Sequence, residues 1–138
     1  MKKKFLLLLI FVALCILHSK AQPIIQFEQD SLNFDTVEQN QVVKVDYKFK
    51  NIGTDTLIIR RIRTDGDGFY TDCNDPMVLP GKSGSISVMF YSGGKVGIEH
   101  NYFAVYSNAK NRTKFLVLQG YVKKPKAPVI PPPTLKDK

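Results

Sequence analysis

The residues best able to do chemistry are gathered in positions 65–75, a stretch of aspartates and glycines. Four carboxylates and one amide occur within these 11 residues, in the order Asp65, Asp67, Asp72, Asn74 and Asp75. Oxygen ligands of this kind are those that Ca²⁺ prefers, although no glutamate closes the segment as in an EF-hand. The segment is therefore a candidate calcium site, and the other interpretation is a polar loop whose aspartates and glycines only make turns.

Two aromatic residues, Phe69 and Tyr70, lie inside the same stretch. Aromatic rings beside carboxylates suit the apolar faces of sugars, although the core of a folded domain explains such rings equally well. Residues 65–75 are thus also a candidate loop for a carbohydrate-dependent or calcium-dependent ligand-binding module.

A catalytic site is hard to build from the remaining reactive residues. Only one cysteine, Cys73, and one histidine, His100, follow position 21. A thiol beside an imidazole can act as a nucleophile, but the pair also needs a group that orients the imidazole, and the sequence implies none. We expect no catalytic residues, no enzyme activity and no cofactor other than the candidate calcium ion.

Arg60, Arg61 and Arg63 form the only basic cluster in the middle of the chain. On a strand, alternation predicts Arg61 and Arg63 on one face and Arg60 on the other. A patch divided in this way is too small for the phosphate contacts that nucleic-acid binding needs. Nucleic acid is therefore not expected as a partner.

The formal net charge of +8 comes from the two ends of the chain. Residues 22–122 hold eleven basic and eleven acidic residues, whereas residues 1–21 hold four lysines and no acid. Residues 1–21 combine a lysine-rich start, a 13-residue apolar run and small residues at Ser19 and Ala21, which is typical of a cleaved secretory signal peptide. Export to the periplasm, the cell envelope or the medium of a bacterium is expected.

Two alternatives for the first segment stay open. An uncleaved membrane anchor would need about 20 apolar residues, more than this run contains. Lipidation at Cys15 would need a small residue before it, where the sequence has Leu14. No membrane span is predicted.

Residues 123–138 carry five lysines and five prolines without a periodic apolar pattern. This composition favours a flexible basic tail, in polyproline II or disordered form. A ligand for a proline-binding groove or an anionic surface is the alternative function of this segment.

The elements that must position these residues are strands, because apolar residues in the middle of the chain recur with a period of two. Val43, Val45, Tyr47 and Phe49 alternate with charged residues, as in a half-buried strand. Similar runs separated by turn signals predict one all-β domain over residues 22–122. We expect an immunoglobulin-like antiparallel β-sandwich of about seven strands.

Several short motifs have turn chemistry rather than site chemistry. Asn51 and Gly53 are expected to adopt positive φ at a strand exit, and Pro80-Gly81 suits a type II turn. Asn108 is expected to cap the turn of the last hairpin.

These motifs together resemble a group of secreted bacterial domains. The segments that carry the resemblance are Phe34–Val37, Tyr47–Gly53, Leu57–Ile59, Leu79–Gly84, Val105–Asn108 and Leu118–Val122. In order and spacing they resemble immunoglobulin-like domains of the ASH/MSP (PapD-like) type. They are most similar to an uncharacterised single-domain family whose members usually carry a Cys-x-Cys loop. Here residues 71–75 contain one cysteine, so no metal or disulfide role is carried over.

The leading hypothesis for function is a non-catalytic exported envelope domain that binds another envelope protein. Edge strands of such sandwiches accept a strand from a partner, as in PapD-like chaperones. Residues 24–27 or the last strand, residues 116–122, are the expected edges. The alternative is the ligand-binding module that uses residues 65–75.

Overall fold

The structure is a computed structural model, and it describes residues 21–125. The predicted signal peptide, apart from Ala21, and the predicted tail beyond residue 125 lie outside the described residues. The described part is all-β, and it contains no helix long and apolar enough to cross a membrane.

Nine strands follow one another along residues 21–125. They are β1 (Ile25–Phe27), β2 (Ser31–Glu38), β3 (Val42–Asn51), β4 (Leu57–Thr64), β5 (Phe69–Cys73), β6 (Met77–Val78), β7 (Ser83–Tyr91), β8 (Gly97–Ser107) and β9 (Thr113–Lys123). The runs expected from alternation in β3, β4, β7, β8 and β9 are present.

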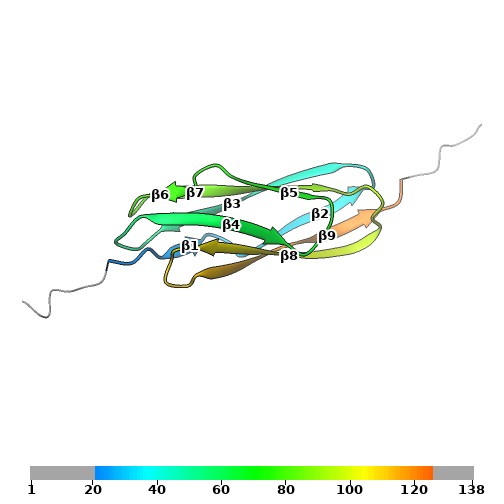
Figure 1. Cartoon of the computed structure of the whole chain (residues 1–138). Coiled ribbons are helices and arrows are strands. Elements are labelled where there is room, and N and C mark those ends of the chain that lie inside the picture. The colour runs from blue at the N-terminus through cyan, green and yellow to red at the C-terminus, as the bar shows by residue number, and fades with distance from the viewer. Residues whose placement is uncertain (1–20, 126–138) are drawn as a thin grey trace, which may run out of the picture.

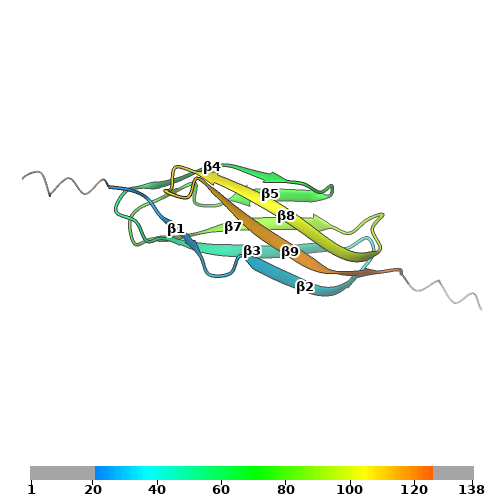
Figure 2. The same cartoon turned by 90° about the horizontal axis from the view of Figure 1, so that it is seen from below.

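The strands form two stacked sheets, so the predicted immunoglobulin-like sandwich is confirmed (Figures 1 and 2). One sheet has the order β1-β3-β7-β5, and the other has the order β2-β9-β8-β4-β6. All pairs are antiparallel except β2 with β9, which is parallel. The chain enters β1 and leaves β9 at opposite ends of the domain (Figure 1).

The core lies between the sheets and is built by the alternating residues. Tyr47 and Phe49 of β3 are each 1% exposed, and the lysines between and beside them face solvent. Phe103 and Val105 of β8 point inward, as expected from the sequence, while Tyr102 and Tyr106 lie on the outer face. Period-two patterning therefore sets which face of each strand is buried.

The predicted division of the arginine cluster is wrong, because β4 contains a bulge. The register with β8 shifts between Ile59 and Arg61, so that Ile59 lies opposite Ser107 and Arg61 lies opposite Tyr106. The extra residue, Arg60, changes the phase of the strand. Ile62 is then turned toward the core, and all three arginines are exposed.

Residues 24–27 or the last strand were expected to form the exposed edge, and only the first of these alternatives is correct. β1, which contains most of residues 24–27, is an edge strand. The last strand, β9, lies inside its sheet because β2 pairs with it on the side away from β8. The sequence around β2 gave no sign of a parallel pairing, since its partner is about 85 residues away along the chain.

One fully buried amide, that of Asn51 at the end of β3, joins several segments. Its Nδ2 donates to the carbonyl oxygens of Asp55 (2.7 Å) and Val78 (2.9 Å). Its Oδ1 accepts from the backbone N–H groups of Gly53 (3.0 Å) and Ile24 (3.4 Å). The side chain thus satisfies backbone groups near β1, in the β3–β4 loop and in β6.

The turn motifs are partly as predicted. Gly81 has φ of 76°, and Lys82 N–H donates to the carbonyl of Leu79, so Pro80-Gly81 does form a type II turn. Gly53 does not have positive φ. It is needed because a Cβ there would clash with the carbonyl oxygen of Gln22.

Two further expectations about asparagines were wrong. Asn51 does not have positive φ. Asn108, instead of capping its own hairpin, bridges to the chain before and at the start of β4. Its Oδ1 accepts from Ile58 N–H (2.7 Å), and its Nδ2 donates to the carbonyl of Thr56 (2.9 Å).

Tyr47 links the two sheets through a hydrogen bond inside the core. Its hydroxyl donates to the carbonyl oxygen of Val117 in β9 at 2.6 Å. Burial raises the pKa of the Tyr47 phenol well above its ordinary value near 10, because the phenolate would lose its hydration. The folded state therefore holds this proton more tightly than the unfolded chain does.

We predict that Asn51→Ala lowers the free energy of unfolding by about 3 kcal/mol, because it leaves several buried backbone groups without partners. Urea denaturation of the domain measures this loss. Asn74→Ala is the matched control, since Asn74 is exposed and a surface change is expected to cost about 0.5 kcal/mol. Equal losses for the two variants would contradict the role given to Asn51.

We predict that Tyr47→Phe lowers the free energy of unfolding by about 1–2 kcal/mol at pH 7, because the Val117 carbonyl loses its donor. A phenol whose pKa is raised on folding stabilises the protein below the ordinary pKa, and this contribution is lost as the pH rises above it. By pH 11 the difference between wild type and Tyr47→Phe should be about 1.4 kcal/mol smaller than at pH 7. Urea titrations at both pH values test this, and a constant difference would count against it.

Candidate functional site

The four aspartates of the candidate calcium loop do not share one loop. The prediction of a continuous loop over residues 65–75 is wrong, because residues 69–73 form strand β5. Asp65 and Asp67 precede this strand, and Asp75 follows it. A five-residue strand is about 16 Å long, so the two ends of the segment are held apart. Asp72 lies within β5, with its side chain exposed.

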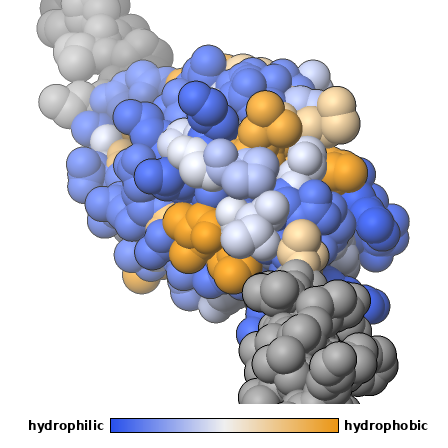
Figure 3. All heavy atoms as spheres, turned by 90° about the vertical axis from the view of Figure 1, so that its left-hand side faces the viewer, coloured by the Kyte–Doolittle hydropathy of each residue, from blue (hydrophilic) through white to orange (hydrophobic). Residues whose placement is uncertain are grey.

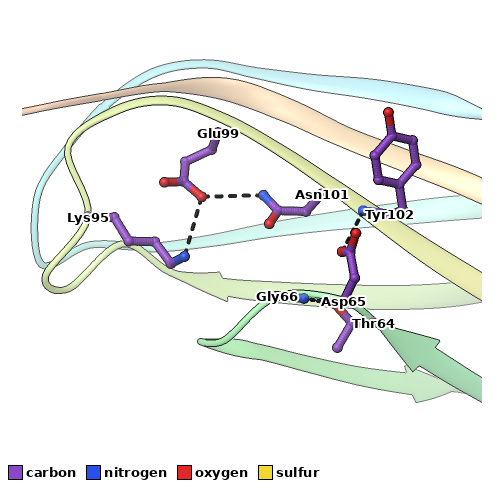
Figure 4. A network of polar contacts seen from close by, with 7 residues as sticks. All are labelled: Thr64, Asp65, Gly66, Lys95, Glu99, Asn101 and Tyr102. Carbon is purple, nitrogen blue, oxygen red and sulfur yellow. Dashed lines mark hydrogen bonds and ion pairs between the residues drawn. The ribbon is translucent and has the colours of Figure 1, made fainter.

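Asp65 has a structural role at the start of this segment (Figure 4). Its carboxylate accepts a hydrogen bond from the backbone N–H of Tyr102 in β8, at 3.0 Å. The hydroxyl of Thr64 accepts from the N–H of Gly66 at 3.2 Å. These bonds fix the turn that leaves β4 and leads to β5.

A second polar group lies near this turn, on β8 and the loop before it (Figure 4). The Glu99 carboxylate pairs with the Lys95 ammonium at 3.4 Å and accepts from the Asn101 amide at 3.4 Å. Within residues 21–125, no three His, Cys, Asp or Glu side chains are grouped as metal ligands. Calcium binding by residues 65–75 therefore stays a prediction that no gathered ligand set supports.

The aromatic pair of the candidate carbohydrate loop is divided between core and surface. Phe69 stacks on Phe90 with ring centroids 4.8 Å apart and meets the edge of Phe103 at 5.2 Å. Tyr70 points to the other side of β5 and is 61% exposed. Only Tyr70 is available to a ligand.

Cys73 and His100 are in different sheets and face different surroundings. Cys73 of β5 is half-buried and packs against the core. His100 of β8 is exposed on the outer face of the other sheet, with its ring 5.0 Å from that of Tyr102. The geometry does not bring the thiol and the imidazole together as a nucleophile and its base.

The environment of Cys73 also keeps its thiol protonated. Burial raises the pKa of the Cys73 thiol, and the negative charges of Asp75 and Asp72 raise it further. A hydrogen bond from the backbone of Asp75 acts in the opposite direction but does not reverse the shift. A reactive cysteine needs a lowered pKa, so this thiol is poorly suited to catalysis.

The four edge strands of the sandwich differ in how well they are protected. β1 has three residues and β6 has two, which leaves little backbone for pairing. β2 is longer, but its register breaks between Asn33 and Thr36, where Asp35 has φ of 58°. Short strands and bulges are two ways in which proteins block unwanted pairing at an edge.

β5 is the one of these four edge strands that is neither limited to two or three residues nor interrupted by a bulge. Its five residues keep an unbroken antiparallel register with β7, from Phe69 opposite Phe90 to Cys73 opposite Ile86. β5 lies at the border of its sheet, on the side of β7 away from β3 (Figure 2). β5 is therefore the candidate site for contact with another chain.

The hydrogen bonds at the two ends of β5 show which backbone groups face outward. Tyr91 N–H donates to the carbonyl of Gly68, and Asn74 N–H donates to the carbonyl of Ser85. In an antiparallel ladder the paired positions alternate, so Tyr70 and Asp72 bond to β7. The N–H and C=O groups of the odd-numbered residues of β5 then point away from the sheet; these residues are Phe69, Thr71 and Cys73.

The sequence of β5 itself has the alternation of a strand. Phe69, Thr71 and Cys73 alternate with Tyr70 and Asp72, and turn residues bound the run on both sides. The density of aspartates and glycines around the run favoured a loop interpretation instead.

Solved structures share this fold at low sequence identity. A protein of unknown function from Porphyromonas gingivalis W83 has a TM-score of 0.66 at 12% identity, and the match covers 77% of this chain and 50% of that one. The ASH / PapD-like domain 7 of human CEP192 has a TM-score of 0.56 at 13% identity, with 76% and 89% covered. This chain spans half the length of the Porphyromonas protein.

A protease also contains a domain of this shape. The VesB protease of Vibrio cholerae has a TM-score of 0.54 at 12% identity, and the match covers 82% of this chain and 35% of the protease. Likeness at such identities shows the fold alone, because one fold serves many functions. No curated protein matches the sequence.

The family comparison covers nearly the whole sandwich. The model of a family described as a protein of unknown function, DUF1573, matches residues 25–122, from the first residue of β1 almost to the end of β9. The chain belongs to the DUF1573 family.

Proposed function

We propose that this protein is a non-catalytic exported envelope domain that binds another protein by accepting a strand at the open edge of β5. The observation that carries the proposal is the unbroken, unprotected register of β5 at the border of its sheet. The proposed partner is an envelope protein that offers an extended segment.

Strand addition at β5 would use main-chain hydrogen bonds for affinity. Three residues of β5 have backbone groups that point away from the sheet, and each offers one N–H and one C=O. A hydrogen bond contributes about 0.5–1.5 kcal/mol net. Side chains next to the edge would provide specificity. Tyr70 is an exposed aromatic residue on β5 itself, and tyrosine is enriched among residues that dominate binding energy.

Export is the part of the proposal that rests on the sequence of residues 1–21. The domain that would remain after cleavage has equal numbers of acidic and basic residues in positions 22–122. A neutral domain of this kind offers no general attraction to polyanions, which favours a specific protein contact over charge-driven binding.

The absence of catalysis is supported by the surroundings of the two reactive side chains. The Cys73 thiol faces the core and has a raised pKa, while His100 is exposed on the other sheet. The fold of this domain also occurs within a larger protein that is a protease, and such a neighbour says nothing of activity in this chain.

We predict that Thr71→Pro abolishes capture of the partner while the domain stays folded. Proline removes an N–H that faces away from β7, so it blocks strand addition without removing a bond of the ladder. The measurement is a pull-down from an envelope extract with wild type and variant, alongside a thermal melt of each.

A second test compares two tyrosines with exposed rings, one on β5 and one as its matched control. Tyr70→Ala should weaken capture, whereas Tyr121→Ala, on the outer face of the other sheet, should leave it unchanged. Equal capture by wild type and a folded Thr71→Pro variant would refute strand addition at β5. Binding to a glycan array with no protein partner would favour the carbohydrate alternative.

We predict that Cys73 reacts with iodoacetamide more slowly at pH 7 than a free cysteine. The cause is its raised pKa and partial burial, so the rate should rise as the pH increases above the ordinary pKa of a thiol. Mass spectrometry of the native protein measures the rate. His100→Ala should not change it; fast labelling at pH 7 that this variant slows would reveal a thiol–imidazole pair.

A further inference from the structure

Three arginines from two parts of the chain line one open groove on the five-stranded sheet. The groove has a volume of about 430 Å³, and its walls are Arg60, Arg61, Tyr106, Ser107 and Arg112. Its volume lies within the 300–1,000 Å³ typical of sites for small molecules. No acidic side chain lines it.

Local backbone features bring these arginines together. The bulge in β4 exposes Arg60 as well as Arg61. Arg112 belongs to the β8–β9 turn, where its carbonyl oxygen accepts from the N–H of Ser107 at 2.9 Å. A regular β4 would have alternated Arg60 and Arg61 between the two faces, so the bulge is a condition for the cluster.

The charge of the groove is left uncompensated. Every ion pair found in residues 21–125 uses a lysine: Lys95 with Glu99, Lys114 with Asp30 and Lys123 with Glu38. Arg60, Arg61 and Arg112 take part in none of these pairs. Three guanidinium groups close together repel one another, so a bound anion would relieve a cost that the free domain carries.

Arg61 is also held in place before any ligand arrives. Its guanidinium carbon lies 5.1 Å from the centre of the Tyr106 ring, a cation–π contact. Stacking of this kind restricts the side chain, so less conformational freedom is lost when its N–H groups bind a ligand.

We propose that this groove binds a phosphate group, either free or carried by a sugar or a lipid headgroup. A phosphate monoester has about −1.5 to −2 charges near pH 7 and three terminal oxygens that arginine forks bind in pairs. A single carboxylate has one charge and two oxygens, which one guanidinium already satisfies. The charge and number of donors in this groove therefore match phosphate better.

The surroundings of the groove fit a polar ligand. Figure 3 shows the end of the sandwich at which the β8–β9 turn lies; hydrophilic residues cover most of its visible surface, and hydrophobic residues form separate small areas. The groove is in the opposite sheet from β5. The phosphate site and strand addition at β5 can therefore each be correct without the other.

The test is an NMR titration of the ¹⁵N-labelled domain in 150 mM NaCl, about physiological ionic strength. The probes are inorganic phosphate, glucose 6-phosphate and vesicles that contain phosphatidic acid, whose headgroup is a phosphate monoester, with succinate as a dianion of carboxylates. We expect saturable shifts at the residues of the groove with a phosphate probe. Arg61→Gln and Arg112→Gln should each weaken binding about tenfold, the loss expected for one charge-assisted hydrogen bond.

Arg63→Gln is the matched control, because Arg63 is exposed on the same strand but does not line the groove. It should change the affinity less than twofold. Tighter binding of glucose 6-phosphate or of the vesicles identifies the source of the phosphate. The proposal is overturned if no probe gives saturable shifts, if succinate binds as well as phosphate, or if Arg63→Gln weakens binding as much as Arg61→Gln.

Discussion

The fold depends on one buried amide group, the side chain of Asn51. It is inaccessible to solvent, and both its donors and its acceptor are used by backbone groups from segments on either side of β3. Backbone groups at the end of a sandwich would otherwise be buried without partners, which costs more than the hydrogen bonds themselves contribute. By satisfying them, Asn51 closes the end at which β1, the β3–β4 loop and β6 meet.

Polar groups elsewhere in the core are also paired. The residues between the sheets are apolar apart from a few hydrogen-bonded groups, and among the described residues no buried polar side-chain atom lacks a partner. The two features that we propose as binding sites lie at the periphery. They are the outward backbone groups of β5 on one sheet and the uncompensated arginines on the other.

The sequence predicted the sandwich well where local alternation decides the structure. The inward residues of β3 and β8, such as Tyr47 and Phe103, follow directly from a period of two. Two local features were not predicted from the sequence. The bulge at Arg60 adds one residue to a strand without a distinct sequence signal, and it reversed the faces expected for the residues after it. Strand β5 was not predicted because it is flanked by aspartates and glycines that are typical of turns.

The pairing of strands that are far apart in the sequence was also not predicted. The choice of β2 as the neighbour of β9 depends on contacts between the two ends of the domain, so alternation within either strand could not reveal it. That pairing removes β9 from the edge. It leaves β5 as the edge with the longest unbroken register, and so it moves the candidate site to residues 69–73.

The central claim is that the β5 edge is open in the free domain. Amide hydrogen exchange, followed residue by residue by NMR, tests it most directly. The N–H groups of Tyr70 and Asp72 should be protected by β7, while those of Phe69, Thr71 and Cys73 should exchange much faster. Equal protection along all five residues would show that the edge is already covered, and it would contradict the account.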